Sequence, residues 1–345
     1  MKLFAGPDMP SSRRFETQEA GAGQRGMTPS VYPTDGILLI DKPTGLSSAE
    51  VVRRIKALVR PERVGHVGTL DPLASGLLPI VIGEATKLAP FLETVDKEYH
   101  GIIQLGLETD TLDSEGQVTA RAPVPALDSP TLARVEGMFS GEVTQTVPIF
   151  SAVKRQGQPL YKLARRGLTI TPPARTVTIR SLRLQAVAED RLSFVLVCSK
   201  GTYARALARD IGRALGSVAL LAELKRTRSA GFSLDQSCAL DDALATLKCR
   251  FGHDSHDDFG LLIAMRDALA DLQQVSVDAM TARRLRNGDA SVLELPQALE
   301  TVEPRPVKVL LGGNLIAIAE LRSGRSRLLR VFRPKPGDLY SSESV

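Results

Sequence analysis

The stretch GHVGTLDPLASGLLP spans residues 65–79 and is the most informative part of the chain. Its one carboxylate, Asp71, stands among apolar residues, with Leu70 before it and Pro72 and Leu73 after it. Surface acids usually have polar neighbours, so this setting predicts a partly desolvated carboxylate. The glycines of the stretch indicate a turn around it. We therefore expect the chemistry of the protein at Asp71.

A plainer interpretation of Asp71 is the start of a helix. Aspartate is favoured at the residue that caps a helix, and proline is favoured at the first helical position, so Asp71 and Pro72 are a typical pair for a helix start. The two interpretations are compatible, because Pro72 favours extended backbone at Asp71 and a cap residue can point its side chain into a cleft.

The composition is that of a globular protein. With 345 residues and 43% hydrophobic content, the chain is long enough for about two domains with real cores. No apolar stretch approaches the roughly 20 residues of a membrane helix, and the first residues lack the apolar core of a secretory signal, which predicts a cytoplasmic protein. The three cysteines have no metal-ligand spacing and are expected to be reduced.

The positive charge is concentrated in one segment. The whole chain carries a net charge of +5, yet residues 141–183 alone hold eight basic residues against one acid, Glu142. The basic residues are Lys154, Arg155, Lys162, Arg165, Arg166, Arg175, Arg180 and Arg183. Such a block is typical either of a surface that binds a polyanion or of a solvated basic face.

Residues 1–34 are rich in Gly, Ser, Pro and Arg and are predicted to be a disordered tail, with translation starting at either Met1 or Met27. The folded part is expected to begin with a strand at residues 36–40. A helix follows, because Ser47 and Glu50 have the spacing of a capping box. Further strands are expected at 78–82, 98–105 and 192–198, and further helices at 84–92 and 203–215. These elements do not alternate regularly, which favours an α+β fold with a mixed, largely antiparallel sheet and flanking helices.

The last part of the chain has a different sequence pattern. Three short strands are predicted at residues 307–311, 315–321 and 328–332, with turns at 312–314 and around 323–324. We expect a small β domain at 273–335, after a linker or helix at 251–272 and before a tail at 336–345. The segment HDSHDD at 253–258 is either a polar insert or a set of metal ligands. No Walker-type or dinucleotide glycine loop is found, so no nucleotide cofactor is expected.

Four segments together resemble one known family. They are Lys42-Pro43-Thr44-Gly45, the stretch 65–79, Lys97-Glu98-Tyr99 and Gly201-Thr202-Tyr203-Ala204-Arg205. Their order is that of the TruB family of tRNA pseudouridine synthases, and His66 and Asp71, five apart, form the most specific motif. The resemblance covers about residues 35–335, with a catalytic domain at 35–250 and C-terminal strands that resemble a PUA domain, an RNA-binding module.

The resemblance implies a function. A member of this family isomerises a uridine in the T loop of tRNA, at conventional position 55, to pseudouridine, without a metal or other cofactor. Its partner would be the T arm of tRNA, and no protein partner would be obligatory; a monomer is implied. The basic insert at 141–183 would clamp the RNA, although Val147 stands where the family usually has a second proline. The alternative is an RNA-folding or ribonucleoprotein component that uses the same surface without turnover of its own.

The resemblance also assigns roles to residues. Asp71 would act on the target uridine, by nucleophilic attack or by a glycal route, with Arg205 as its partner. Tyr99 would stack on the flipped uracil and is a candidate to take the proton from C5. The residues implied in substrate or RNA binding are His66 near the T arm, Tyr203 and Leu224 in the pocket wall, Lys42 as a structural or RNA-proximal lysine, and Lys154, Arg155 and Arg165 in the clamp.

The chemistry agrees with these roles. Pseudouridine forms when the bond between N1 and C1′ breaks, the base turns and C5 joins C1′, so no water is consumed. Hydrolytic glycosidases need two carboxylates, whereas this reaction needs one. Burial would favour a neutral Asp71, so the Arg205 guanidinium is expected to keep it ionised. Stacking on Tyr99 would offset part of the cost of flipping the base.

Overall fold

A computed structural model gives the structure of the protein. The residues that it describes are 35–59, 63–151, 153–155, 157–166, 168, 171–252, 260–294, 305–322 and 325–333. Several predicted segments lie outside the described residues. They are the tails at 1–34 and 336–345, the segment 253–258 and the turn residues 323–324. No described helix is both long enough and apolar enough to cross a membrane.

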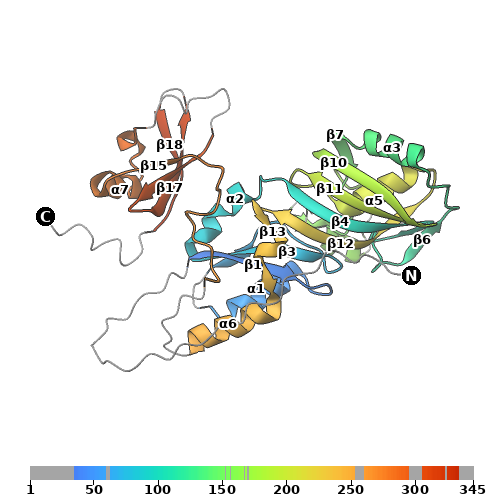
Figure 1. Ribbon diagram of the computed structural model, residues 1–345, viewed down its shortest axis with the longest axis horizontal. Coiled ribbons are helices and arrows are strands. Elements are labelled where there is room, and N and C mark those ends of the chain that lie inside the picture. The colour runs from blue at the N-terminus through green and yellow to red at the C-terminus, as the bar shows by residue number, and fades with distance from the viewer. Residues whose placement is uncertain are drawn as a thin grey trace. The chain divides into compact units, whose positions relative to one another are not determined.

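The main sheet has ten strands in the described part of the chain (Figure 1). Eight follow the order β14-β1-β3-β12-β4-β11-β10-β7, while β13 pairs with β12 and β2 pairs with β3. The bounds are β1 Gly36–Lys42, β2 Val64–His66, β3 Ser75–Ile82, β4 Lys97–Leu105, β7 Gly141–Thr146, β10 Ala174–Ala188, β11 Arg191–Cys198, β12 Ala219–Ser229, β13 Phe232–Ser233 and β14 Cys238–Ala239. Only the β1–β14 and β3–β12 pairs are parallel, which confirms the predicted mixed, largely antiparallel sheet.

Helices flank this sheet (Figure 1). The longer ones are α1 Ser48–Lys56, α3 Ser129–Met138, α5 Ala204–Ala214 and α6 Leu240–Gly252. Helix α1 begins after Ser47, whose hydroxyl accepts a hydrogen bond from the backbone N of Glu50, as the capping pattern predicted. Helix α5 packs along β12 and buries Leu207 and Ile211, which join the main hydrophobic core. The expected helix at 84–92 is instead a 3-10 turn, η1 Gly83–Leu88, followed by the short α2 Ala89–Leu92.

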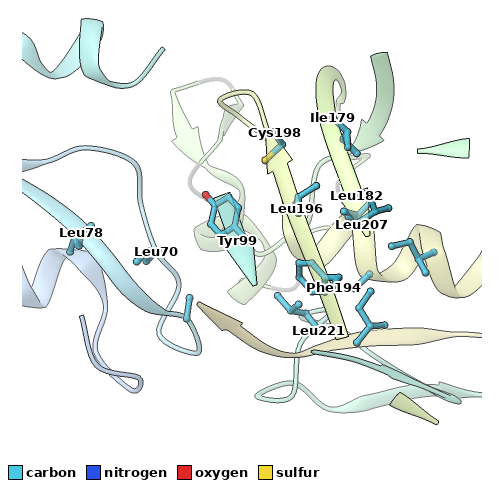
Figure 2. Packing of buried hydrophobic residues seen from close by; sticks show 14 of the residues in the cluster. Leu70, Leu78, Tyr99, Ile179, Leu182, Phe194, Leu196, Cys198, Leu207 and Leu221 are labelled. Carbon is cyan, nitrogen blue, oxygen red and sulfur yellow. The ribbon is translucent and has the colours of Figure 1, made fainter. Parts of the chain in front are cut away.

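The centre of the sheet places Tyr99 in the core. Strand β4 runs between β11 and β12, and Tyr99 lies directly opposite Leu196 on one side and Arg226 on the other. Figure 2 shows the Tyr99 ring beside Leu196 and Cys198, with Phe194 and Leu221 farther along the same core. The core therefore fixes the ring of Tyr99 from behind.

Smaller elements surround this framework. A hairpin of β5 Leu107–Thr109 and β6 Val118–Arg121 follows β4, and the basic insert forms a second hairpin before a short helix. The elements of the insert are β8 Lys154–Arg155, β9 Gln158–Pro159 and α4 Leu160–Arg165.

A separate four-stranded sheet, in the order β15-β16-β17-β18, ends the described chain. The bounds are β15 Gln274–Ser276, β16 Val307–Leu311, β17 Asn314–Arg322 and β18 Arg325–Val331. The three C-terminal strands confirm the prediction, but the segment is not purely β, because helix α7 Ala279–Arg286 and the 3-10 turn η3 Ala290–Val292 pack beside the sheet. Phe332 is also buried in a cluster with Leu88 of η1.

Candidate active site

A cavity of about 230 Å³ opens among the segments that the sequence singled out. Its lining includes Asp71, Tyr99, Tyr203, Arg205 and Leu224, which come from three separate motifs and from β12. The fold thus brings together five of the predicted site residues. His66 and Lys42 are not part of the lining.

Asp71 lies in a turn between β2 and β3. The backbone N of Ala74 donates to the carbonyl of Asp71, which closes a tight turn, and no helix begins at Pro72. The interpretation of Asp71 as a helix cap is therefore wrong. The Asp71 side chain is 41% exposed, because it points into the open cavity. It is less desolvated than its apolar neighbours predicted.

Arg205 is the buried member of the central ion pair. It is the second residue of α5, and its side chain is only 6% exposed. Nε lies 2.9 Å from Oδ2 of Asp71, but the N–H does not point along that line, so the contact is an ion pair without a well-formed hydrogen bond. Nη1 donates to the carbonyl of Thr111 and Nη2 to that of Phe150, both at 3.0 Å. Two backbone carbonyls therefore hold the guanidinium in place.

A second acid, Asp113, also faces Arg205. Its Oδ2 lies 3.6 Å from Nη1 of Arg205, and its side chain is 6% exposed. Oδ1 of Asp113 accepts hydrogen bonds from the Thr111 hydroxyl and from the backbone N of Glu115. Since a buried guanidinium needs a compensating charge, Asp113 supplies it independently of Asp71. The sequence interpretation had one carboxylate at this site and missed this one.

Tyr99 is buried at the back of the cavity. Burial raises the pKa of its phenol above the usual 10.0, and the nearby Arg226 charge opposes this only in part. The phenol is therefore neutral at neutral pH. Tyr203, the residue just before α5, and Leu224 of β12 line the same cavity, which agrees with their predicted place in its wall.

Arg226 was not anticipated from the sequence. It is fully buried in the central strand β12, where Nε donates to the carbonyl of Leu77 and Nη2 to that of Gly68, at 2.8 and 2.9 Å. Leu77 and Gly68 lie on opposite sides of Asp71 in the chain. Arg226 thus ties both ends of the Asp71 loop to the centre of the sheet.

Gln145 holds the backbone of Tyr203. Its side-chain oxygen accepts from the backbone N of Tyr203 at 3.1 Å, and its amide nitrogen donates to the Tyr203 carbonyl at 3.4 Å. Tyr203 is the residue that caps α5, and its own side chain makes no capping hydrogen bond. The buried Gln145 therefore fixes the start of α5 from β7.

Lys42 has a structural place. It is fully buried, and its Nζ donates to the carbonyls of Pro43 and Leu46 at 2.8 and 2.7 Å. Burial lowers the pKa of Lys42 from 10.5 to about 8, while the Asp71 charge opposes this shift. Of the two roles that the resemblance left open, these contacts fit the structural one.

His66 lies on β2, beside the Asp71 loop. Burial lowers the pKa of its imidazole below 6.5, with Arg226 acting in the same direction, so the ring is neutral at neutral pH. Its Nδ1 is buried and has no hydrogen-bond partner among the described residues. The ring can therefore contribute packing and hydrogen bonding, but not a positive charge for phosphate binding.

The structure describes the backbone of the predicted clamp residues. Lys154 and Arg155 form β8, and Arg165 ends α4. Arg175 of β10 does line the cavity, where its Nη1 lies 2.7 Å from the position that a Cβ on Gly201 would occupy. Gly201, whose φ is +82°, therefore leaves the space that this guanidinium fills. Arg175 was counted in the basic block but not singled out.

Comparison with known proteins identifies the class. A family model described as "TruB family pseudouridylate synthase (N terminal domain)" matches residues 56–204. A protein named tRNA pseudouridine synthase B from Aromatoleum aromaticum is 42% identical over 254 residues, 74% of this chain and 80% of its own length. One of the same name from Geobacter sulfurreducens is 36% identical over 86% of this chain and 99% of its own. The chain belongs to the TruB family of pseudouridylate synthases.

Alignment lengths vary among these relatives. The chain covers 61% of the tRNA pseudouridine synthase B of Psychrobacter cryohalolentis, at 42% identity. Among solved structures, one described as "Crystal Structure of a Cbf5-Nop10-Gar1 Complex" matches with a TM-score of 0.68 and 24% identity, over 89% of this chain and 88% of that chain. The fold of this chain is therefore similar to that structure over both the ten-stranded sheet and the C-terminal four-stranded sheet.

Proposed function

We propose that this protein converts a uridine in the T loop of tRNA, position 55, to pseudouridine, as a stand-alone enzyme. The observation that carries the proposal is the placement of Asp71. One partly exposed carboxylate faces a cavity, paired with a buried guanidinium and flanked by a buried aromatic ring. The relatives named tRNA pseudouridine synthase B support the choice of substrate.

The reaction begins with the target uridine flipped out of its stack. The cavity, at about 230 Å³, has room for a pyrimidine ring, and the ring of Tyr99 at its back offers a stacking surface. Stacking on an aromatic side chain stabilises a flipped base by about 1 to 3 kcal/mol, which offsets part of the cost of unstacking.

Asp71 then acts on the nucleotide, either by attacking C1′ or by removing the proton from C2′ on a glycal route. Its carboxylate is 41% exposed toward the cavity, so it can reach the sugar while it stays beside Arg205. The Arg205 guanidinium stays in place because Thr111, Phe150 and Asp113 hold it from other sides. The fixed positive charge stabilises the carboxylate as charge moves during cleavage.

The freed uracil turns within the cavity, C5 joins C1′ and the proton at C5 leaves. Tyr99 is the candidate to take that proton; because its phenol is neutral, it can do so only by passing its own hydroxyl proton on to a water molecule in the same step. The buried hydroxyl of Ser151 also lines the cavity and has no hydrogen-bond partner among the described residues, so it is available to the nucleotide.

The flanking RNA would be held by basic side chains. Arg175 lines the cavity and belongs to the basic insert at 141–183, which begins with β7. We also propose that residues 273–335 form a second RNA-binding domain, because the last turn of helix α7 is rich in arginine and Arg283 in it is exposed. Cationic side chains bind phosphates without regard to sequence.

Tritium release tests the function. Purified protein is mixed with a tRNA transcript that carries uridine labelled with tritium at C5, and release is compared between wild type and Asp71→Asn. We expect release of one tritium per tRNA from wild type and none from the variant, with similar tRNA affinity. Normal release by the variant would exclude Asp71 as the catalytic group.

The same assay separates the alternative, an RNA-folding or ribonucleoprotein component. That protein would bind tRNA but release no tritium alone. A tRNA in which position 55 is cytidine is the matched substrate control, because it keeps the T-arm fold and removes the target.

A further inference from the structure

The two peptide groups beside Asp71 are held by a distant part of the chain. Residues 43–48 follow β1 and lie against the Asp71 turn, where two residues of this segment bond to the residues on either side of Asp71. The Asp71 side chain itself has one described ion pair and is partly exposed. Its position is therefore set largely by its backbone.

Ser48 makes the first contact. Its hydroxyl accepts from the backbone N of Leu70 at 2.8 Å and donates to the carbonyl of the same residue at 2.9 Å. Ser48 is buried, and both of these hydrogen bonds go to Leu70. The capping of α1 does not use this hydroxyl, because Ser47 supplies the cap. Ser48 thus satisfies both backbone groups of the residue before Asp71.

Gly45 makes the second contact. Its backbone N donates to the carbonyl of Pro72, the residue after Asp71, at 2.8 Å. Gly45 has a φ of +82°, a conformation that favours glycine. The Lys42 ammonium fixes this turn from inside through the carbonyls of Pro43 and Leu46. One buried lysine, one glycine and one serine therefore form a continuous support for the Asp71 turn.

We propose that Ser48 is a positioning residue for Asp71, which acts by fixing both peptide groups of Leu70 while Gly45 fixes Pro72. The proposal rests on the catalytic role of Asp71 under the proposed function. Reaction rates fall by about 100-fold when reacting groups are misplaced by about 1 Å. A loosened turn would affect the chemical step and leave the distant RNA contacts intact.

The neighbouring serines give a matched pair of variants. Ser48→Ala removes both hydrogen bonds to Leu70, whereas Ser47→Ala removes only the helix cap of α1. We expect Ser48→Ala to lower the single-turnover rate about 100-fold with a tRNA dissociation constant within about twofold of wild type. Ser47→Ala should leave both quantities within about twofold, since its effect is confined to α1 stability.

Hydrogen exchange gives a readout that does not depend on turnover. The Leu70 amide should lose its protection in Ser48→Ala and keep it in Ser47→Ala. Ser48→Cys, which keeps a weak donor at nearly the same volume, serves if the alanine variant does not fold, and it should be intermediate in both measurements.

The outcomes are distinct. Equal rates in the folded Ser47 and Ser48 variants, or a rate loss without a change at the Leu70 amide, would overturn the positioning role. A wild-type protein without tritium release would instead refute the proposed function, and the exchange experiment would still test the contact between Ser48 and Leu70.

Discussion

Asp113 and Asp71 both pair with the guanidinium of Arg205, but Asp113 is buried and Asp71 is partly exposed. Asp113 is almost fully buried, with Oδ2 3.6 Å from Nη1, whereas Asp71 is 41% exposed, with Oδ2 2.9 Å from Nε. The buried acid therefore balances the arginine, and the exposed acid is free to meet the substrate. Stability and activity should depend differently on the two carboxylates.

Asparagine variants of the two acids test this division. Asp113→Asn leaves a buried guanidinium without its buried counter-charge and should lower the free energy of unfolding by about 3 kcal/mol. Asp71→Asn removes a partly exposed ion pair and should change it by no more than about 1 kcal/mol. Chemical denaturation of both variants measures the difference. Equal losses would contradict the assigned roles.

Two variants of Tyr99 should separate the contribution of ring stacking from that of proton transfer. Tyr99→Phe keeps the ring and removes the hydroxyl, so tRNA affinity should change little while turnover falls about 100-fold or more if the hydroxyl takes the C5 proton. Tyr99→Leu removes the ring as well and should weaken binding of the flipped base by about 1 to 3 kcal/mol. Rapid-quench turnover and filter binding distinguish the two effects. Full activity of the phenylalanine variant would assign the proton to another acceptor.

Lys42 makes stability depend on pH in the alkaline range. Its pKa is about 8 in the folded protein and about 10.5 in the unfolded chain. The native state therefore releases its proton first as pH rises, and stability should increase between about pH 8 and 10.5, by about 3 kcal/mol in all. Below pH 8 both states are protonated and the native state bears the full penalty.

Lys42→Met isolates this contribution. Other groups titrate in the same range, so the quantity to compare is the difference in unfolding free energy between wild type and variant at each pH. The unfolding free energy of wild type should therefore rise relative to that of the variant from about pH 8 upward. A difference independent of pH would show that Lys42 keeps its ordinary pKa.

Arg175 is expected to contact phosphate near the flipped nucleotide. Arg175→Ala should weaken tRNA binding and reduce the slope of log affinity against log salt by about 1. Arg180→Ala is the control on the same strand, because Arg180 already pairs with Asp96 at 3.1 Å. Binding isotherms at several salt concentrations measure both slopes. Equal slopes in the two variants would remove Arg175 from the RNA surface.

Much of the fold was predictable from local pattern. The buried run of β1, the alternation in β11 and the apolar stripe of α5 each carry a clear period in the sequence. The longest strand, β10, was missed because an irregularity in its pairing with β11, between Ile179 and Ser181, shifts the register. The alternation changes phase there, so the segment does not read as one strand.

Central strand β12 was missed for another reason. Its second half contains Glu223, Lys225, Arg226 and Arg228, a density of charge that is typical of a surface. Arg226 is nevertheless fully buried, because the carbonyls of the Asp71 loop accept its hydrogen bonds. Such a partner is visible only once the chain is folded.

The candidate site was predictable where motifs are contiguous. Asp71, Tyr99, Tyr203 and Arg205 lie together as expected. Asp113 was missed because its position depends on the loop before it. Leu112 in that loop adopts a φ of +64°, and no local sequence pattern predicts that conformation. Long-range contacts between side chains and backbone are the part that sequence leaves open.

The pairing of β4 with β11 has a practical consequence for dividing the chain. The two acids and Tyr99 precede the exposed segment at residues 122–128, and Arg205 follows it. A break in that segment would separate Arg205 from Asp71, Asp113 and Tyr99. The strand pairing from Lys97 and Cys198 to Gln104 and Arg191 would then have to re-form before any uridine could react. A protein divided in this segment would be active only when its two fragments reassociate, so its activity would report their association.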